Sequence, residues 1–459
     1  MSFFPNPITA TGTTTPRTLV ARFGEVLNVK DFGAAGDGIT EDSTAIQAAI
    51  TKAISLSAGA IGDYYRGAVV YLPKGTYLVS SNISWSSSAA SGITLMGDGP
   101  GITIIKCNRD SGDIITVGDT TNRIDNTRIL DMTFYSVPQM SSGAIIRVIN
   151  GYNTTLRNLR FPENPDYPSP LSGNAFNSSF TRIYTCIDIQ SGSVNQLSFQ
   201  TYIENININN GVVGIKLGDN GGIVQDTYIS KSIIAQCVDT GILLKNTGGT
   251  YLTDGSTLYC KTGLATYPDS GKNVMWTFMS GWLCDTSVTD GFKIITNGGV
   301  VRSIQMVNCW ASNNGRWQND QSSSVTFPSE GRGMWVSQGT GTVGALTITN
   351  FTALANRQEG FYVTGASKIS LMNPNFCGNS AFSSNSYDGA NFFNTSEWSI
   401  TGGMSGNTVP NLTNTQRYGL SIGGTSNQYQ VIGMNLYGNQ TGGLDDGGGV
   451  TKYVAGNLS

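Results

Sequence analysis

The sequence lacks histidine entirely and has few charged residues, which make up 12% of its 459 positions. Without an imidazole the chain cannot form a Ser-His-Asp triad, so any acid or base chemistry must come from carboxylates, Arg, Lys or Tyr. The net charge of -3 and the lack of any basic tract argue against nucleic acid as a partner. No apolar run reaches the ~18 residues of a membrane-spanning helix, so the sequence predicts no membrane insertion.

The seven cysteines never occur as Cys-x-x-Cys, and their number is odd. Cysteines in such a pattern are more often small buried apolar residues than disulfide partners or zinc ligands. The sequence therefore predicts no metal site and no cofactor.

The most regular feature of the sequence is a repeat. Cys237, Cys260, Cys284 and Cys309 follow one another at nearly constant spacing, and each ends a short apolar run. A glycine followed by apolar residues recurs at Gly241, Gly263, Gly291, Gly333, Gly360 and Gly419. A period of this length is typical of stacked units that cannot bury their apolar faces alone. The repeat predicts coils of short parallel strands, with the four cysteines in an inward-facing ladder.

One amphipathic helix is predicted near the start, with Thr40 or Asp42 as its cap. Its apolar positions fall on one face, at Ile46, Ala49, Ile50, Ala53 and Ile54. Because the helix precedes the first coil, we expect it to cover the unpaired edge of the stack.

Three motifs in residues 28–105 resemble a known family. They are Asp31-Phe-Gly-Ala-x-Gly-Asp-Gly-x-Thr, Tyr71-Leu-Pro-x-Gly-x-Tyr and Leu95-x-Gly-x-Gly. Their order resembles the pectate-lyase-like right-handed parallel β-helix family, and phage tail spikes within it especially. The resemblance implies an all-β fold, a right-handed parallel β-helix with an N-terminal capping helix. It also implies a homotrimer that is attached to the virion tail or baseplate. The Gly-His-Gly motif of polygalacturonase-type members is absent.

Two segments are expected from composition. Residues 1–27, rich in Thr and Pro and without a period, are expected to be a leader that attaches to the virion. Residues 28–459 are expected to be a single β-helix domain, with excursions from the stack near 161–180 and 313–332. Such excursions usually lie on the binding face of a solenoid.

Aligning the coils on the repeating glycine places a column of mostly polar residues directly before it. The column is Thr240, Thr262, Asp290, Arg332, Glu359, Asp388 and Tyr418. Adjacent rungs lie ~5 Å apart and alternate rungs ~10 Å. Glu359 and Asp388, on adjacent rungs, therefore suit the carboxyl spacing of a retaining glycosidase. Asp290 and Glu359, on alternate rungs, approach the spacing of an inverting one. Arg332 would lower the pKa of one carboxylate while burial raises that of another.

Glu330, in the second excursion, completes the candidate catalytic set of Glu359, Asp388, Asp290, Arg332 and Glu330. The other interpretation is a salt-bridge ladder at a solvated corner, which would stabilise the fold little and do no chemistry.

Five tryptophans fall within a short stretch of the chain: Trp276, Trp282, Trp310, Trp317 and Trp335. Sugar rings have apolar faces that stack on exposed indoles, although large aromatics are also common core residues. We expect two or three of the five to be exposed and to line a glycan groove over residues 250–390.

Three functions fit these observations. The first is a phage tail spike that binds and cleaves a bacterial surface polysaccharide outside the host cell, by glycoside hydrolysis with two carboxylates. The second is a polysaccharide lyase that uses Arg332 or a lysine for β-elimination on a uronate polymer, with Ca²⁺ as the one conceivable cofactor. The third is a non-catalytic adhesin, which needs only the groove.

Overall fold

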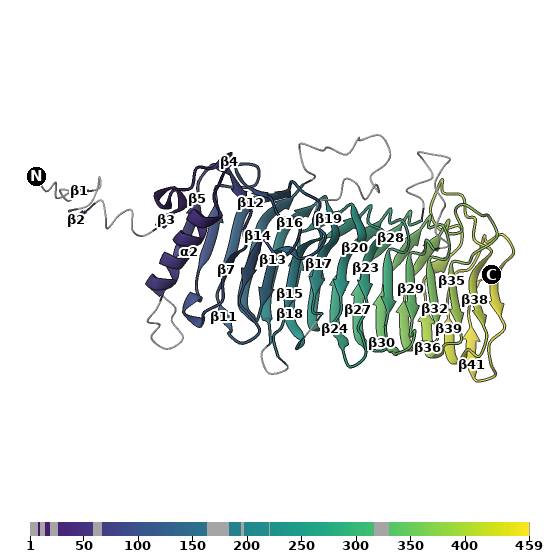
Figure 1. Ribbon diagram of the computed structural model, residues 1–459. Coiled ribbons are helices and arrows are strands. Elements are labelled where there is room, and N and C mark those ends of the chain that lie inside the picture. The colour runs from purple at the N-terminus through teal and green to yellow at the C-terminus, as the bar shows by residue number, and fades with distance from the viewer. Residues whose placement is uncertain are drawn as a thin grey trace, which may run out of the picture.

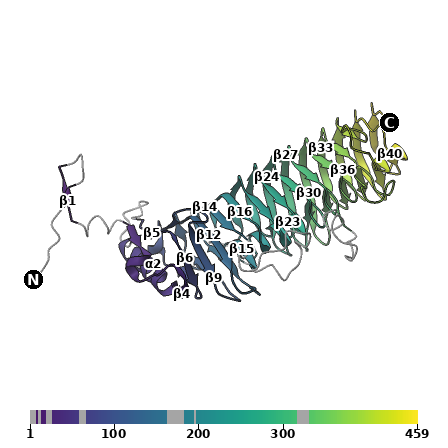
Figure 2. The same ribbon diagram turned by 90° about the horizontal axis from the view of Figure 1, so that it is seen from above.

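The chain winds into a long rod of stacked coils, shown from two sides in Figures 1 and 2. This computed structural model describes residues 8–9, 14–18, 26–57, 67–162, 183–193, 197–219, 221–315 and 330–458. The predicted right-handed parallel β-helix is confirmed. Much of the predicted leader, and most of the two predicted excursions, lies outside the described residues.

One wall of the rod is a parallel sheet of thirteen strands, hereafter the thirteen-stranded face. Its strands are β7 (Ile83–Trp85), β10 (Ile115–Val117), β13 (Ala144–Ile149), β15 (Thr185–Gln190), β17 (Gly211–Leu217), β20 (Cys237–Leu244), β23 (Thr262–Thr266), β26 (Phe292–Ile295), β29 (Met334–Ser337), β32 (Phe361–Thr364), β35 (Ala390–Phe393), β38 (Tyr418–Gly423) and β40 (Gly442–Asp446). They alternate apolar side chains inward with mixed side chains outward, as a half-buried sheet requires.

A second sheet of twenty-six strands turns a corner and forms the other two walls. The long-strand face contains β3 (Val26–Asn28), β5 (Val69–Leu72), β8 (Thr94–Gly97), β11 (Ile124–Asp125), β12 (Arg128–Ser136), β14 (Gly151–Phe161), β16 (Phe199–Ile208), β18 (Val224–Ser230), β21 (Thr247–Thr253), β24 (Asn273–Ser280), β27 (Val300–Val307), β30 (Thr342–Thr349), β33 (Ser367–Met372), β36 (Ser396–Thr401), β39 (Asn427–Ile432) and β41 (Lys452–Ala455).

The short-strand face contains β4 (Asp37–Glu41), β6 (Gly75–Val79), β9 (Thr103–Cys107), β19 (Ile233–Ala235), β22 (Ser256–Leu258), β25 (Leu283–Asp285), β28 (Trp310–Ser312), β31 (Thr352–Leu354), β34 (Asn375–Cys377) and β37 (Met404–Ser405). The long strands β12, β14 and β16 run through the corner into this face. Outside the rod's walls, β1 (Ile8–Thr9) pairs with β2 (Pro16–Arg17), and two short 3-10 helices, η1 (Val29–Phe32) and η2 (Ser88–Ala90), lie near the start.

The corner between the long-strand and short-strand faces is made by single residues with positive φ. Asn308, Asn350 and Asn373 occupy this position in successive rungs, with φ between 51° and 53°. Asn tolerates the left-handed region better than most residues do. The side-chain amides also bond to one another, from Asn350 to Asn308 at 2.9 Å and from Asn373 to Asn350 at 3.0 Å.

The predicted capping helix is confirmed as α2 (Ser43–Ser57), which closes the first coil in Figure 1. Its predicted inner face is buried, and Ile46, Ala49 and Ile50 have no exposed surface. Asp42 stands at the N-cap position, as predicted, and its carbonyl accepts a hydrogen bond from the N–H of Ile46 at 3.0 Å. Its carboxylate accepts instead from the backbone N–H groups of Ala35 and Gly36, so the side chain fixes the preceding glycine-rich turn.

The repeating glycines form a column in which each backbone leaves no room for a side chain. A Cβ atom at Gly333 would lie 2.5 Å from the carbonyl oxygen of Gly360, and one at Gly360 would lie 2.8 Å from that of Gly389. Any side chain here would push two rungs apart. The column therefore sets the register of the coils.

The predicted cysteine ladder is confirmed for three of its four members. The thiols of Cys237, Cys260 and Cys284 lie behind successive glycines of the column, at 3.0 to 3.1 Å from the Cβ positions those glycines lack. Their backbone positions are not equivalent, because the residue that pairs with Cys284 is Thr257 and not Cys260. Cys309 is buried, but Asn314 fills the space behind the next glycine, Gly291, and Ala311 is the residue that pairs with Cys284, so that part of the prediction is wrong.

Behind the next glycines, a line of buried amides continues the thiol ladder. Asn314 donates to Asn356 at 2.8 Å, Asn356 to Asn379 at 2.8 Å, and Asn379 to Gln416 at 2.9 Å. Each buried amide satisfies the next one, so the ladder lowers the cost of placing polar groups in the core.

We predict that Gly333→Ala lowers the free energy of unfolding by about 1–3 kcal/mol, because the new methyl group overpacks the contact between two rungs. The matched control is Gly442→Ala, where the nearest atom to the new Cβ is 3.5 Å away. The measurement is the midpoint of denaturant unfolding followed by circular dichroism. Equal midpoints for both variants would show that the column does not set the register.

Candidate functional site

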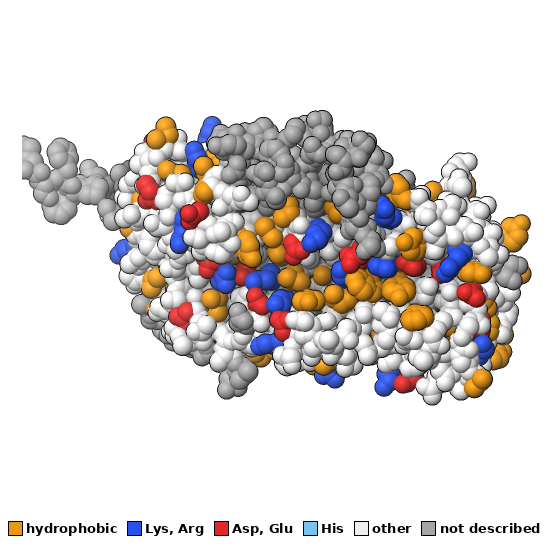
Figure 3. Space-filling model, turned by 45° about the vertical axis from the view of Figure 1, so that its right-hand side comes forward, with side chains coloured by type: hydrophobic (Ala, Val, Ile, Leu, Met, Phe, Trp, Pro, Cys, Tyr) orange, Lys and Arg blue, Asp and Glu red, His pale blue; other side chains and the backbone are white. Residues whose placement is uncertain are grey.

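The column predicted before the glycines exists, and its members belong to successive rungs. The N–H of Gly291 bonds to the carbonyl of Arg332 at 3.0 Å, and the N–H of Gly333 bonds to that of Glu359 at 3.1 Å. The column runs along the start of the thirteen-stranded face. Figure 3 shows a band along the rod in which acidic, basic and apolar side chains gather.

Asp290 is a fully enclosed carboxylate of the column, with no exposed surface. It accepts hydrogen bonds from the backbone N–H groups of Arg332 at 2.8 Å and Gly331 at 3.3 Å. Its second oxygen, Oδ2, has no hydrogen-bond partner among the described residues. Burial raises the pKa of Asp290, while the Arg332 guanidinium acts in the opposite direction.

Glu359 and Arg332 form an ion pair beside Asp290. The Arg332 Nε lies 3.2 Å from Glu359 Oε2, and its guanidinium packs over the rings of Trp335 and Tyr362, at 5.2 and 4.9 Å from their centroids. Glu359 is only 7% exposed, and this burial raises its pKa. These aromatic contacts hold Arg332 between the two carboxylates.

Asp388 does not join this cluster in the way the spacing suggested. Arg417 holds it with two hydrogen bonds, at 3.0 and 2.8 Å, and Asn391 and the backbone N–H of Tyr418 add two more. Asp388 has no exposed surface. Its oxygens are fully engaged in holding neighbouring rungs together, which favours a structural role over the predicted catalytic one.

Glu330 is the most accessible of the predicted catalytic carboxylates, with 31% of its side chain exposed. Lys293 Nζ lies 3.2 Å from Glu330 Oε2 and 4.0 Å from Asp290 Oδ2. The two carboxylate oxygens that share this ammonium are therefore at most about 7 Å apart, a limit that the roughly 5 to 5.5 Å spacing of a retaining glycosidase would satisfy.

A groove of about 540 Å³ lies beside this cluster, across β20, β23 and β26. It is lined by Asp239, Thr240, Leu243, Lys261, Thr262, Ala265, Tyr267, Thr289, Lys293, Ile295 and Glu330. Small side chains on β23 hollow the surface. One end carries the Glu330–Lys293 pair and another part of the lining carries Asp239, whose Oδ1 lies 3.6 Å from Lys261 Nζ.

The five predicted tryptophans do not share one groove. Trp335 packs against the cluster, with Lys293 Nζ 4.7 Å from its ring centroid. Trp276 and Trp310 are exposed, at 49% and 40%, but belong to the long-strand and short-strand faces. The prediction for Trp282 is wrong, because it has no exposed surface and fills the core. Trp317 lies outside the described residues.

Lys261, Lys293 and Arg417 are the site residues that the sequence interpretation missed. Lys293 was detectable, because it is the outward residue of the strand that follows Gly291 and stands three positions after Asp290. Arg417 was not, because it stands 29 residues and a full coil away from its partner Asp388 and directly precedes the column residue Tyr418 instead of belonging to the column.

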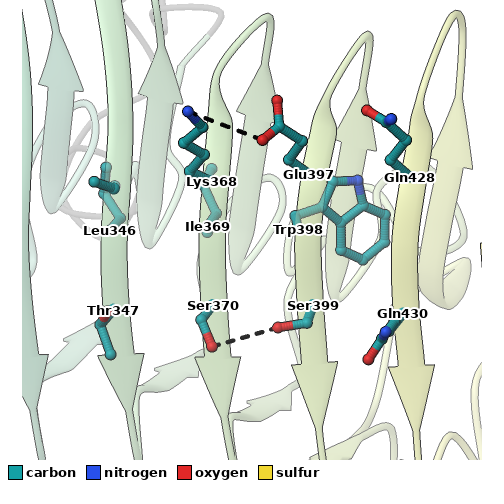
Figure 4. A pocket seen from close by; sticks show the side chains of 11 residues that line it. Leu346, Thr347, Lys368, Ile369, Ser370, Glu397, Trp398, Ser399, Gln428 and Gln430 are labelled. Atoms are coloured by element: carbon teal, nitrogen blue, oxygen red, sulfur yellow. Dashed lines mark hydrogen bonds and ion pairs between the residues drawn. The ribbon is translucent and has the colours of Figure 1, made fainter.

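A second, shallower groove of about 410 Å³ lies on the long-strand face (Figure 4). Its polar groups are mostly hydroxyls and amides, with Ser370 and Ser399 3.4 Å apart. Its charged residues are Lys368 and Glu397, 3.9 Å apart and more than half exposed. Because it holds no buried carboxylate, this groove suits acid and base chemistry less well than the first.

Two absences hold for the residues that the structure describes. No three His, Cys, Asp or Glu side chains in these ranges come together in a way that could hold a metal ion. No helix in the same ranges is long and apolar enough to cross a membrane.

Comparison with known sequences gives one family and several partial relatives. The model of the rhamnogalacturonase A/epimerase, pectate lyase-like family matches residues 26–265. Mannuronan C5-epimerase AlgE5 of Azotobacter vinelandii is 35% identical over 134 residues, 27% of this chain and 12% of that protein. Alginate lyase 7 of the same organism is 45% identical over 82 residues, 17% of this chain and 8% of that protein. The chain thus spans about a tenth of these two relatives.

Solved structures with the same fold include two phage proteins and an enzyme. Pre-mature gene product 12 of bacteriophage phi29 has a TM-score of 0.63 at 17% identity, over 94% of this chain and 55% of that one. Tailspike protein 3 of bacteriophage CBA120 has a TM-score of 0.59 at 13% identity, over 98% and 64%. An exopolygalacturonase from Thermotoga maritima has a TM-score of 0.52 at 12% identity, over 91% of each chain. At these identities the likeness shows the fold alone.

We predict that Glu359→Gln changes how stability depends on pH. Because the folded-state pKa of Glu359 is raised, its contribution to stability is complete below the ordinary glutamate pKa of about 4 and is lost as pH rises through the folded value. The stability of the native chain relative to the variant should therefore fall with rising pH.

The measurement is the difference in unfolding midpoint between the native chain and Glu359→Gln across a pH series. Glu397→Gln removes an exposed glutamate and serves as the control. If the native chain instead became more stable relative to Glu359→Gln as pH rises, the Arg332 ion pair would outweigh burial in setting the pKa of Glu359.

Proposed function

The chain belongs to the rhamnogalacturonase A/epimerase, pectate lyase-like family, and from this we propose that it binds and cleaves a bacterial surface polysaccharide in the groove on the thirteen-stranded face. The observation that carries the proposal is the groove itself. Its lining combines charged and hydroxyl side chains with the apolar Leu243, Ala265 and Ile295, and the carboxylate cluster adjoins it at Glu330 and Lys293. Such a lining fits a chain of sugar rings, whose hydroxyls need fixed polar partners.

Hydrolysis requires one carboxyl group that protonates the glycosidic oxygen and one carboxylate that activates water or attacks the sugar. Glu330 and Asp290 differ in the required way. Glu330 faces the groove, whereas Asp290 is buried with a raised pKa. We assign Asp290 as the proton donor and Glu330 as the base or nucleophile, and we assign Lys293, whose ammonium lies between the two carboxylates, to move aside when the sugar binds.

Arg332 and Glu359 act as positioning residues in this scheme. Arg332 lies 3.8 Å from Asp290 and 3.2 Å from Glu359, so it balances the charge of the cluster. In this proposal Asp388 holds Arg417 and takes no part in the reaction.

β-Elimination on a uronate polymer is the second candidate, and a specific observation favours it. Lys261, Lys293 and Tyr267 all line the groove, and together they could neutralise a sugar carboxylate and remove the neighbouring proton. The partial relatives are named as a mannuronan epimerase and an alginate lyase, which also points to uronates. A purely adhesive spike is the third candidate.

We predict that Glu330→Gln reduces polysaccharide cleavage by at least a hundredfold, because general acid–base catalysis contributes about 10²–10⁴-fold. Stability should hardly change, since Glu330 is partly exposed. Reducing ends released from purified host capsule or O-antigen measure hydrolysis, and ultraviolet absorbance of the unsaturated product measures elimination. Glu397→Gln, another glutamate paired with a lysine, should retain full activity.

A product that absorbs in the ultraviolet would show that the reaction is elimination and would contradict the proposed hydrolysis. No product of either kind from any host polysaccharide, with binding retained, would leave the adhesive spike.

We further propose a virion-attached homotrimer, in which residues 1–27 attach to the phage tail and the long-strand faces of three copies meet. Tyr202, Tyr228, Tyr251 and Phe278 stack on this face with centroids 4.7 to 5.1 Å apart. The outward residues in register with Phe278 farther along are uncharged: Gln305, Thr347, Ser370, Ser399 and Gln430. Stable interfaces are likewise rich in aromatics and poor in charge.

The size of this face also fits. Nine strands from β16 to β39, ~4.8 Å apart and about eight residues long, offer about 1000 Å² per chain, against the ~800 Å² per partner of a standard interface.

We predict that Tyr251→Glu dissociates the trimer, because it places a charge in the middle of an uncharged interface. Sedimentation velocity measures the mass of the particle. Tyr437→Glu, at a position that is 72% exposed, is the control. A native chain that sediments as a monomer would contradict the proposed assembly, whatever the variant does.

A further inference from the structure

A hydrogen-bonded cluster on the short-strand face holds an exposed indole in place. Trp310 Nε1 donates to Ser312 Oγ at 2.8 Å, and Ser312 Oγ donates to Asp285 Oδ1 at 2.7 Å. Asn313 Nδ2 donates to the same carboxylate oxygen at 3.0 Å. The cluster joins two neighbouring rungs, because β25 and β28 pair with Asp285 opposite Ser312.

The cluster fixes the orientation of the Trp310 ring. Trp310 and Ser312 are two residues apart on one strand, so both side chains point to the same side of the sheet. The bond between them makes the indole lie along β28, with one ring face toward the sheet. The side chain is nevertheless 40% exposed. A rigid aromatic ring with one open face is the result.

The neighbours of the ring combine apolar and polar groups. Trp310 pairs with Leu283 on one neighbouring strand and with Thr352 on the other. The hydrogen bonds to Asp285 from described residues all reach Oδ1, which leaves Oδ2 as an acceptor beside the ring. An apolar ring face next to a carboxylate oxygen matches the surface of a pyranose, which carries hydroxyl donors around an apolar face.

Tyr228, Tyr251 and Trp276 lack this arrangement. The rings of Tyr228 and Tyr251 cover one another's faces, so they present only edges to the solvent. Trp276 is 49% exposed and lies at a position of positive φ. Among the described residues, no hydrogen bond anchors its ring nitrogen.

We propose that Trp310 and Asp285 form a second carbohydrate-binding platform, which takes one hydroxyl-rich sugar ring independently of the groove. The groove lies across β20, β23 and β26 on the thirteen-stranded face, whereas the platform lies on β25 and β28 of the short-strand face. A long polysaccharide could thus be held at one face while another segment of it occupies the groove. The platform does not depend on whether the groove is catalytic.

The test uses the full chain labelled with 5-fluorotryptophan and observed by fluorine NMR. The Trp310 resonance is assigned by its loss in Trp310→Phe. The probes are cello-, malto- and galacto-oligosaccharides and the purified host polysaccharide, titrated into the Glu330→Gln variant so that cleavage cannot consume them. We expect one probe class to shift the Trp310 resonance in a saturable way.

Matched variants separate the platform from its surroundings. Trp310→Ala should weaken binding of that probe roughly tenfold, in line with the energy of aromatic stacking. Ser312→Ala should weaken binding less and should broaden the Trp310 resonance, because the ring loses its anchor. Trp276→Ala should leave the affinity unchanged, and none of the three should alter the cleavage rate of a short substrate.

Two results would overturn the proposal. The first is a Trp310 resonance that no probe shifts while the resonance of Trp335, which packs against the cluster beside the groove, responds. The second is a change of particle mass in Trp310→Ala, which would mean that another copy of the chain covers this face. Loss of cleavage in Glu330→Gln with a responsive Trp310 would support both sites, and retained cleavage with a responsive Trp310 would contradict only the groove assignment.

Discussion

The close approach of backbones at the glycine column is the constraint on which the rest of the molecule depends. In each rung a carbonyl of the next coil occupies the space that a Cβ would need, 2.5 Å away at Gly333. This contact permits only one register, because a shift by one residue would bring a side chain into the gap. Thiols and then amides fill the space behind it, from Cys237 to Gln416. The column thus fixes both the outer surface and the core.

Fixed register explains why charge gathers on one wall. The residues before the glycines stand on successive rungs, close enough for each cation to bridge two carboxylates. Lys293 does so between Glu330 and Asp290, and Arg332 does so between Asp290 and Glu359. Mutual neutralisation lets these groups lie partly buried, where a neighbouring charge and desolvation pull a pKa in opposite directions. The same register aligns an uncharged row of outward residues, from Gln305 to Gln430, on the long-strand face.

The fold was largely predictable, because the repeat, the apolar face of α2 and the motifs at Asp31, Tyr71 and Leu95 all indicate one architecture. The candidate site was predictable only in part. The spacing placed Asp290, Arg332 and Glu359 correctly in one column. It could not show that Asp388 is fully bonded to Arg417, or that Trp282 is core while Trp310 is exposed. Coil loops vary in length, so equal spacing of Cys309 with the other cysteines did not mean an equal position.

The sequence by itself determined the coil, because glycines, short β-prone runs and an amphipathic helix are local signals that each segment carries independently. It also determined which residues share a column, since that follows from the period once the glycines are aligned. Only the tertiary structure decided which carboxylates face solvent, which cations bridge them and where the surface is hollowed. Those properties depend on contacts between rungs whose side chains are far apart in the chain, and on burial, which no single segment sets alone.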